Sequence, residues 1–273
     1  MLCRHFEQIV PVTHKEGEVL QYLNFRIIST EQGVSFDQTK HIKDNVISIF
    51  FNEEEERFKT QDTPFRTDST FERELQESLP ATGKELARLE KEFKGSCLMH
   101  IGTLGHVAQM SRFDISYATT RLDQLSCAPS EAAFIAVKQI YRYLATYPHM
   151  PIFYPRNKIH GTQEFRYDYD PGNFHRMIVS NNLSIWPDAD HARDQRTRQS
   201  MTCVIALLLC VIVHWKMEQQ KCIAAHTTDS EVQAFYTGTK INQYLRAGVS
   251  PCLNQQFSTK TTRHAWTSLL QIK

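Results

Sequence analysis

The sequence lacks a dominant charge, a long apolar run and any closely spaced pair of cysteines. Its 273 residues include 31 Lys and Arg and 30 Asp and Glu, which gives a formal net charge of +1. This balance provides no overall attraction to nucleic acid or to a membrane, so a polyanionic partner must be bound through local charge. The most apolar run, residues 204–213, is about half as long as a bilayer-spanning helix. We interpret it as buried strand and expect no membrane partner.

The seven cysteines are scattered, and none forms a C-x-x-C pair. A disulfide framework or a zinc site requires tighter grouping, so we expect reduced thiols and no disulfide-linked partner. Charged residues interrupt the first seven positions, which argues against a signal peptide. Together these features predict an intracellular protein, cytoplasmic or nuclear. The length allows one large domain or two ordinary ones.

Local patterns predict the elements of the first half. Alternating apolar residues indicate a hairpin over residues 16–36, and Asp37 is placed to cap a helix over 39–50. The polar stretch 53–82 begins with four glutamates, and we interpret it as a solvated, mobile loop. Helical spacing then predicts three helices over 84–147, with Asp114 and Ser130 placed to cap the second and third.

A composition shift after residue 148 places a domain boundary near residue 155. The elements predicted beyond it are a strand through Ile185, a loop over 190–199, two buried strands over 204–215, a short strand over 222–225 and a helix over 230–246 stopped by Gly248. Strands followed by a helix indicate a mixed α/β domain.

Two blocks of motifs occur in a fixed order. The first has G-S-C-L at 95–98, S-R-F-D-I-S at 111–116 and K-Q-I-Y-R-Y-L at 138–144, with D-Q at 37–38 and T-P at 63–64 upstream. The second has D-A-D-H-A at 188–192, R-T-R-Q-S-M-T at 196–202, W-K at 215–216, K-C-I-A at 221–224 and T-T-D-S-E at 227–231.

In this order and spacing, the blocks resemble the C-terminal part of a copia-type retrotransposon polyprotein. The resemblance covers residues 16–246. It implies an α/β (mixed α+β) fold in which the helical thumb and connection region of a reverse transcriptase, residues 1–155, precedes a ribonuclease H-like mixed-sheet domain. That domain would span residues 156–250 and be followed by an atypical tail, residues 251–273.

The chain departs from the family pattern at several positions. Pro187 stands where Ser or Thr is usual, Cys203 where Gly is expected, Met217 and Glu218 in place of Ser-Lys, His226 and Asp229 in place of Ser and Glu, and Asn24 in place of a hairpin Gly. The change to Glu218 reverses a charge that would face a polyanionic substrate.

The family's polymerase holds two divalent ions at a Y-x-D-D turn, but this sequence contains no adjacent Asp pair. The resemblance begins downstream of where that turn would lie. We therefore expect that the chain lacks the polymerase active site and synthesises no DNA.

The resemblance also assigns candidate ribonuclease H residues. Asp188 matches the first-strand aspartate and Glu231 the helix glutamate, so together they are the catalytic and Mg²⁺-binding candidates. The alternative is that Asp188 is an ordinary loop acid and that Glu231 is favoured by the helix dipole. Ribonuclease H chemistry uses two metal ions about 4 Å apart, and clustered carboxylates must hold both.

A third carboxylate is missing, because residues 232–273 contain no Asp and no Glu. Asp190 and Asp194 are possible substitutes, but we expect both in the loop after the first strand, away from the metal pair. An inactive nuclease is thus the favoured outcome, and whether the chain is an enzyme stays open.

An arginine cluster and two histidines are further candidates for a functional role. Arg193, Arg196 and Arg198 form a basic cluster that can contact an RNA–DNA hybrid, with solvated surface as an equal alternative. His191 and His264 are more simply lone exposed histidines than general acids.

Three functions follow from these patterns. The first is an inactive fragment of a copia-type reverse transcriptase and ribonuclease H polyprotein. The alternatives are a weak Mg²⁺-dependent ribonuclease H and a non-enzymatic nucleic-acid-binding module.

Overall fold

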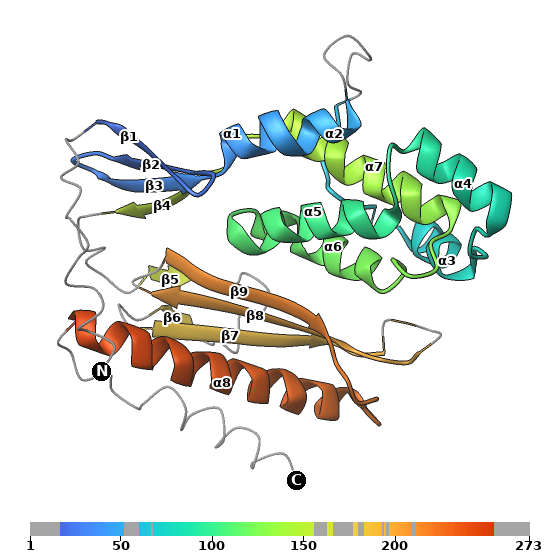
Figure 1. The fold of residues 1–273 in the computed structure, drawn as a ribbon. Coiled ribbons are helices and arrows are strands. Elements are labelled where there is room, and N and C mark those ends of the chain that lie inside the picture. The colour runs from blue at the N-terminus through green and yellow to red at the C-terminus, as the bar shows by residue number, and fades with distance from the viewer. Residues whose placement is uncertain are drawn as a thin grey trace, which may run out of the picture.

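The chain combines helices with three antiparallel sheets (Figure 1). The structure is a computed structural model that describes residues 17–51, 60–66, 68–155, 163–165, 177–179, 183–192, 194, 197–208 and 211–253. The mixed α and β class predicted from the sequence is therefore confirmed. No helix in these ranges is both long and apolar enough to cross a bilayer.

The first sheet has four strands in the order β1-β2-β3-β4. Its members are β1 (Val19–Tyr22), β2 (Phe25–Ser29), β3 (Gly33–Asp37) and β4 (Ile152–Pro155). The predicted hairpin is β2–β3, and β1 adds a second hairpin before it. The turn between β1 and β2 places Leu23 at φ 47° and Asn24 at φ 70°, the pattern that tight two-residue hairpin turns require.

The predicted helix over 39–50 is present as three consecutive pieces. They are α1 (Thr39–His41), a π-helical stretch η2 (Ile42–Ile47) and α2 (Ser48–Phe50). Asp37 caps this segment as predicted, because its Oδ1 accepts the backbone N–H of Thr39 at 2.8 Å. Ile42, Val46 and Phe50 lie on the buried side.

The helical layer contains more helices than predicted. Its elements are α3 (Ser69–Glu77), α4 (Gly83–Glu92), α5 (Cys97–Met110), the 3₁₀ turn η3 (Phe113–Ile115), α6 (Ser116–Asp123) and α7 (Glu131–Thr146). Helix α3 lies within the stretch expected to be a loop, so that expectation was wrong for residues 69–77. Asp68 starts α3 by accepting the N–H of Phe71 at 2.9 Å, and Phe71 and Leu75 are buried. The four glutamates at 53–56 lie outside the described residues.

The caps in this layer were predicted with mixed success. Ser130 caps α7 as expected, since its Oγ accepts the N–H of Ala133 at 3.3 Å. Asp114 does not cap α6, and instead binds Arg112, whose side chain is 1% exposed, at 2.8 Å. Tyr143 of α7 donates its hydroxyl to the same carboxylate at 2.8 Å. Arg112 also donates to the carbonyl of Tyr147 at 2.6 Å. This buried network joins η3 to the end of α7.

The third sheet has three antiparallel strands, β7 (Leu183–Asp190), β8 (Met201–Leu208) and β9 (Val211–Gln219). The two strands predicted around the apolar run are thus confirmed as β8 and β9, although only β8 contains fully buried residues and β9 is mostly half-buried. A separate pair consists of β5 (Gln163–Phe165) and β6 (Met177–Val179).

Helix α8 (Thr227–Leu253) packs along β7 and β8. It begins earlier and ends later than predicted, and it continues through Gly248. The short strand expected over 222–225 is absent, because residues 221–226 form bends and irregular chain.

Contacts link the helical layer to this sheet on the side away from α8 (Figure 1). Trp215 of β9 donates its indole N–H to the carbonyl of Ala108 at 2.7 Å, near the C-terminal end of α5. The same ring meets Phe113 edge-on at 5.9 Å between centroids. The last carbonyls of a helix have no partner within it, so Trp215 satisfies one of them. The boundary expected near residue 155 coincides with the end of β4 and stays a prediction.

Gly238 lies where α8 approaches β7 closely. A Cβ atom there would lie 3.1 Å from Pro187 Cβ and 3.4 Å from Ile185 Cγ2. We expect Gly238→Leu to lower the free energy of unfolding by about 1–3 kcal/mol, because extra atoms must displace the helix from β7. Urea denaturation measures the change. Gly248→Leu is the control, since no described atom beyond the neighbouring residues and backbone of its own helix lies within 4 Å of its Cβ position, and equal stabilities of the two variants would contradict the prediction.

The Arg112 network gives a second prediction. Arg112→Met keeps the apolar stem but leaves Asp114 without its ion pair, so we expect a loss of about 3 kcal/mol in the free energy of unfolding. Tyr143→Phe removes one hydrogen bond and should cost about 1 kcal/mol. The control is Arg88→Met, because Arg88 pairs with Glu85 and Glu92 at the surface. An effect of Arg88→Met as large as that of Arg112→Met would refute the prediction.

Candidate functional site

Asp188 lies near the end of β7, in a row of side chains that crosses the third sheet. It is paired in register with Cys203 of β8, which is paired with Met217 of β9. Ile185 and Pro187 face Gly238 of α8. Since successive side chains of a strand alternate between faces, Asp188 points to the opposite face of the sheet. The row thus places a carboxylate, a thiol and a thioether side by side.

Glu231 lies in the first turns of α8, the helix that covers the other face of the sheet. Partial desolvation raises its pKa above the ordinary value, and the negative charge of Asp188 raises it further. The pKa of the Cys203 thiol is also raised, first by burial and then by Asp188. The structure therefore brings Asp188 and Glu231 within electrostatic range of each other, from different layers of the fold.

Asp190 does not lie where it was expected. It is the last residue of β7, not part of the following loop, and it has the same parity as Asp188 along the strand. The two side chains therefore share a face, so the expectation that Asp190 lies in the loop was wrong, while its place relative to a metal pair stays a prediction. The strand is longer than predicted because it pairs with β8 up to Asp190 and Met201.

Asp194, the other possible substitute, is directed to the helical layer. Its side chain is 3% exposed, and its Oδ2 lies 4.0 Å from Nη1 of Arg121 on α6, a side chain that is 1% exposed. The Nε of Arg121 lies 3.6 Å from a carboxylate oxygen of Glu72 on α3. A buried guanidinium is destabilising unless acidic side chains such as these compensate its charge. Asp194 thus anchors the loop after β7.

Several residues that hold the site together were not singled out from the sequence. The main one is Gln220, which is 5% exposed. Its Nε2 donates to Thr202 Oγ1 at 3.0 Å and to the carbonyl of Ser230 at 2.8 Å. Ser200 Oγ accepts the N–H of Ala192 at 3.0 Å. These bonds join β8, the end of β9 and the start of α8, and a lone polar residue after a strand gives no local signal for that role.

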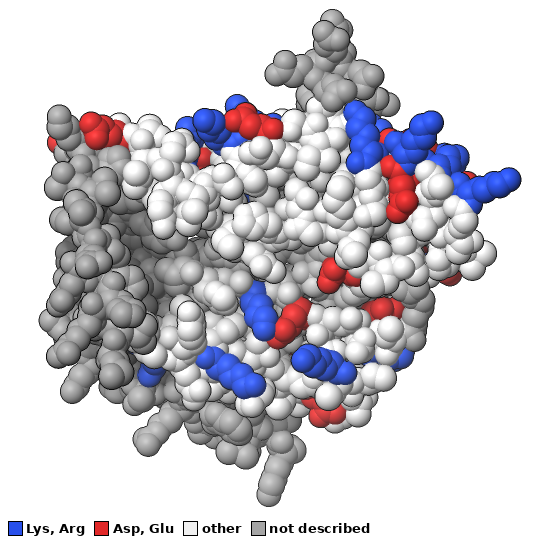
Figure 2. All heavy atoms as spheres, in the orientation of Figure 1, with Lys and Arg blue, Asp and Glu red and all other residues white. Residues whose placement is uncertain are grey.

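The expected basic cluster is only partly described. Arg198 is exposed, has φ 58° and donates its backbone N–H to the carbonyl of Asp194 at 2.7 Å. Arg193 and Arg196 lie outside the described residues. On the face drawn in Figure 2, basic and acidic side chains of the described surface are interspersed instead of gathering by sign.

The sequence predicts that His191 and His264 are exposed, and the structure describes only His191. His191 is half-buried, not exposed, and its Nδ1 is buried without a hydrogen-bond partner in the described part of the chain. His264 lies outside that part.

These side chains do not fit a pair of divalent ions. Two hard cations close together require several oxygen ligands that neutralise and position both. Within the described ranges, no three His, Cys, Asp or Glu side chains are placed to hold even one metal ion. Asp188 and Glu231 supply two carboxylates, and the adjacent positions carry Cys203 and Met217, whose softer sulfur atoms are poor ligands for Mg²⁺.

The electrostatic link between Asp188 and Glu231 can be measured directly. Asp188→Asn removes a negative charge, which makes ionisation of Glu231 easier, so we expect the pKa of Glu231 to fall toward its ordinary value. Carboxyl-detected NMR titration follows this shift. Asp229→Asn should change the pKa of Glu231 less, because residues two apart on a helix do not face each other. An unchanged pKa in Asp188→Asn would show that the two groups are separate.

Comparison with known proteins gives one partial similarity. Over 136 residues, 49% of its length, the chain is 30% identical to the retrovirus-related Pol polyprotein from transposon RE1 of Arabidopsis thaliana. No protein-family model matches the chain. No solved structure matches it. The chain spans 8% of the length of that curated relative, so it is similar to a small part of a retrotransposon polyprotein.

Proposed function

We propose that the chain is a fragment of a copia-type retrotransposon Pol polyprotein whose ribonuclease H-like part is catalytically inactive. In this proposal, residues 1–155 correspond to the C-terminal region of a reverse transcriptase, residues 156–250 to the ribonuclease H-like domain and residues 251–273 to an atypical tail. The similarity to the Arabidopsis transposon polyprotein supports the retrotransposon origin. The two motif blocks support the finer division.

The carboxylate arrangement around Asp188 carries the proposal of inactivity. Among the carboxylates of the described residues, Glu231 is the one whose pKa is raised by the charge of Asp188, after desolvation by burial. Asp194 is held by Arg121 in the helical layer and is therefore withdrawn from the site. Asp190 shares a face with Asp188, yet no triad of acidic, thiol or imidazole ligands forms in the described chain. Two carboxylates do not neutralise two divalent ions beside a polyanionic substrate.

Two departures from the family pattern, on β8 and β9, also support the proposal of inactivity. Cys203 occupies the register position beside Asp188, and its thiol is kept protonated by a raised pKa. A neutral thiol contributes no charge to a metal site. Glu218 pairs with Lys216 at 2.8 Å and so offsets a basic residue on the strand. The change to Glu218 removes an attraction for a nucleic-acid backbone, whereas Cys203, which stands in place of a glycine, adds no charge that could hold a metal ion.

A cleavage assay tests this proposal. The purified chain is incubated with a 5′-labelled RNA strand paired to DNA, in Mg²⁺ and separately in Mn²⁺. We expect no more cleavage than in the same reaction containing EDTA, because the site lacks a third carboxylate ligand. Denaturing gel electrophoresis measures the products.

The control separates this chain's activity from that of a contaminating nuclease. Asp188→Asn is purified in parallel, and cleavage of equal rate in both preparations is assigned to contamination and supports the proposal. Metal-dependent cleavage by the wild-type chain that is lost in Asp188→Asn would overturn it. That outcome would establish a weak ribonuclease H with an RNA–DNA hybrid as substrate and Mg²⁺ as cofactor.

A further inference from the structure

Two histidines from distant parts of the sequence face each other beside the first sheet. His41 is the last residue of α1, and His106 lies in the C-terminal half of α5. Their ring centroids are 5.9 Å apart and the ring planes meet at 80°. His106 is exposed and His41 half-buried. This pair is thus not part of the buried core.

The contrast with His100 shows that the pair has free coordinating capacity. His100 is fully buried, and its Nε2 donates to the Phe93 carbonyl at 2.8 Å while its Nδ1 lies 3.0 Å from the Tyr141 hydroxyl. Both nitrogens of His100 are therefore used in the core. At the surface pair, Asn45 Nδ2 lies within hydrogen-bond distance of His41 Nδ1, at 3.2 Å. Among the described residues, Nε2 of His41 has no hydrogen-bond partner and is available to another ligand.

The spacing of the two rings suits a shared metal ion. A metal–imidazole bond is about 2.0–2.1 Å long, so two imidazoles on one ion hold their ring centres roughly 5–6 Å apart. The two rings meet edge to face and are not stacked against each other. The His41–His106 pair is close to this arrangement before any ion arrives.

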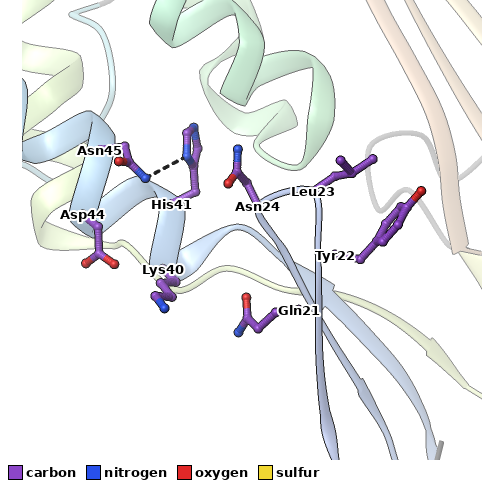
Figure 3. Close-up of a pocket in the computed structure, with 8 residues that line it drawn as sticks. All are labelled: Gln21, Tyr22, Leu23, Asn24, Lys40, His41, Asp44 and Asn45. Carbon is purple, nitrogen blue, oxygen red and sulfur yellow. Dashed lines mark hydrogen bonds between the residues drawn. The ribbon is translucent and has the colours of Figure 1, made fainter. Parts of the chain in front are cut away.

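Asn45 is placed to orient His41 for such a role. When Nε2 of an imidazole binds a metal, Nδ1 carries the proton and needs an acceptor. Turning the Asn45 amide over presents its Oδ1 to that proton without moving the backbone. Figure 3 shows the His41 and Asn45 side chains together on one side of the helix, joined by the dashed hydrogen bond.

The site is open to solvent and its charges are balanced. His41 and Asn45 line an open pocket of about 220 Å³ at the tip of the β1–β2 hairpin. Lys40 and Asp44 also line it, and their side chains point away from His41 (Figure 3). The pKa of His41 is lowered, first by burial and then by His106. Burial and the neighbouring His106 both favour the neutral form of the His41 imidazole, which is the form that binds metals.

We propose that His41 and His106 form a two-histidine site for a borderline divalent transition-metal ion such as Ni²⁺, Cu²⁺ or Zn²⁺. Imidazole ligands select this class of ion over Mg²⁺ and Ca²⁺. Water completes the coordination shell. Binding ties the segment after the first sheet to α5, and it is independent of the Asp188 region.

A Ni²⁺ titration of the full chain tests the site. We expect saturable binding by calorimetry and a rise in the thermal midpoint, because an ion that binds only the folded state stabilises it. His41→Asn and His106→Asn should each weaken the strongest binding step by roughly tenfold or more. The double variant should weaken it no further, since either change alone removes the shared site.

The other histidines of the chain provide the control. His226→Asn alters an exposed histidine that lies 3.6 Å from Asp229, and it should leave the affinity unchanged. Equal Ni²⁺ affinity in the wild-type chain and both single variants would overturn the proposal. Losses that add in the double variant would also overturn it, because they indicate two separate sites. The absence of saturable binding in the wild-type chain would do the same.

Discussion

The sheet of β7, β8 and β9 carries apolar side chains on both faces, and the fold depends on covering both. Pro187, Val204 and Ala206 lie on the side of α8, where Gly238 permits a close approach. Ile205 and Trp215 lie on the other side, where α5 and α6 pack. An apolar sheet face is stable in water only when another layer buries it. The helical layer is consequently a structural requirement of the sheet that carries Asp188.

This arrangement explains what many of the motif residues do. Arg112, Asp114 and Tyr143 belong to two separate motifs and meet in one buried network. Thr202 binds Gln220, which also binds the first turn of α8. Such residues maintain the fold through contacts inside the chain. A recognisable pattern of this kind can therefore be retained for packing alone, independently of any catalytic role.

The sequence predicted local elements well where the signal was local. The hairpin of β2 and β3, the strands β8 and β9 and the Ser130 cap follow from alternation, apolar runs and a capping side chain. The errors arose where tertiary contacts changed the outcome. Helix α3 forms in a polar stretch because Phe71 and Leu75 are buried in the hydrophobic core. Helix α8 passes through Gly248, although glycine often ends a helix.

The candidate site divides in the same way. Asp188 and Glu231 were identified by resemblance, and the lack of acids after Val232 is a property of the sequence itself. The sequence by itself thus determined which carboxylates are available as candidate metal ligands. Only the tertiary structure decided that Asp190 shares a face with Asp188, that Asp194 pairs with Arg121, and that His41 meets His106. The spacing of residues along one helix or strand shows which of them share a face. The pairings above depend on how separate elements pack against each other, and no short stretch of sequence contains that information.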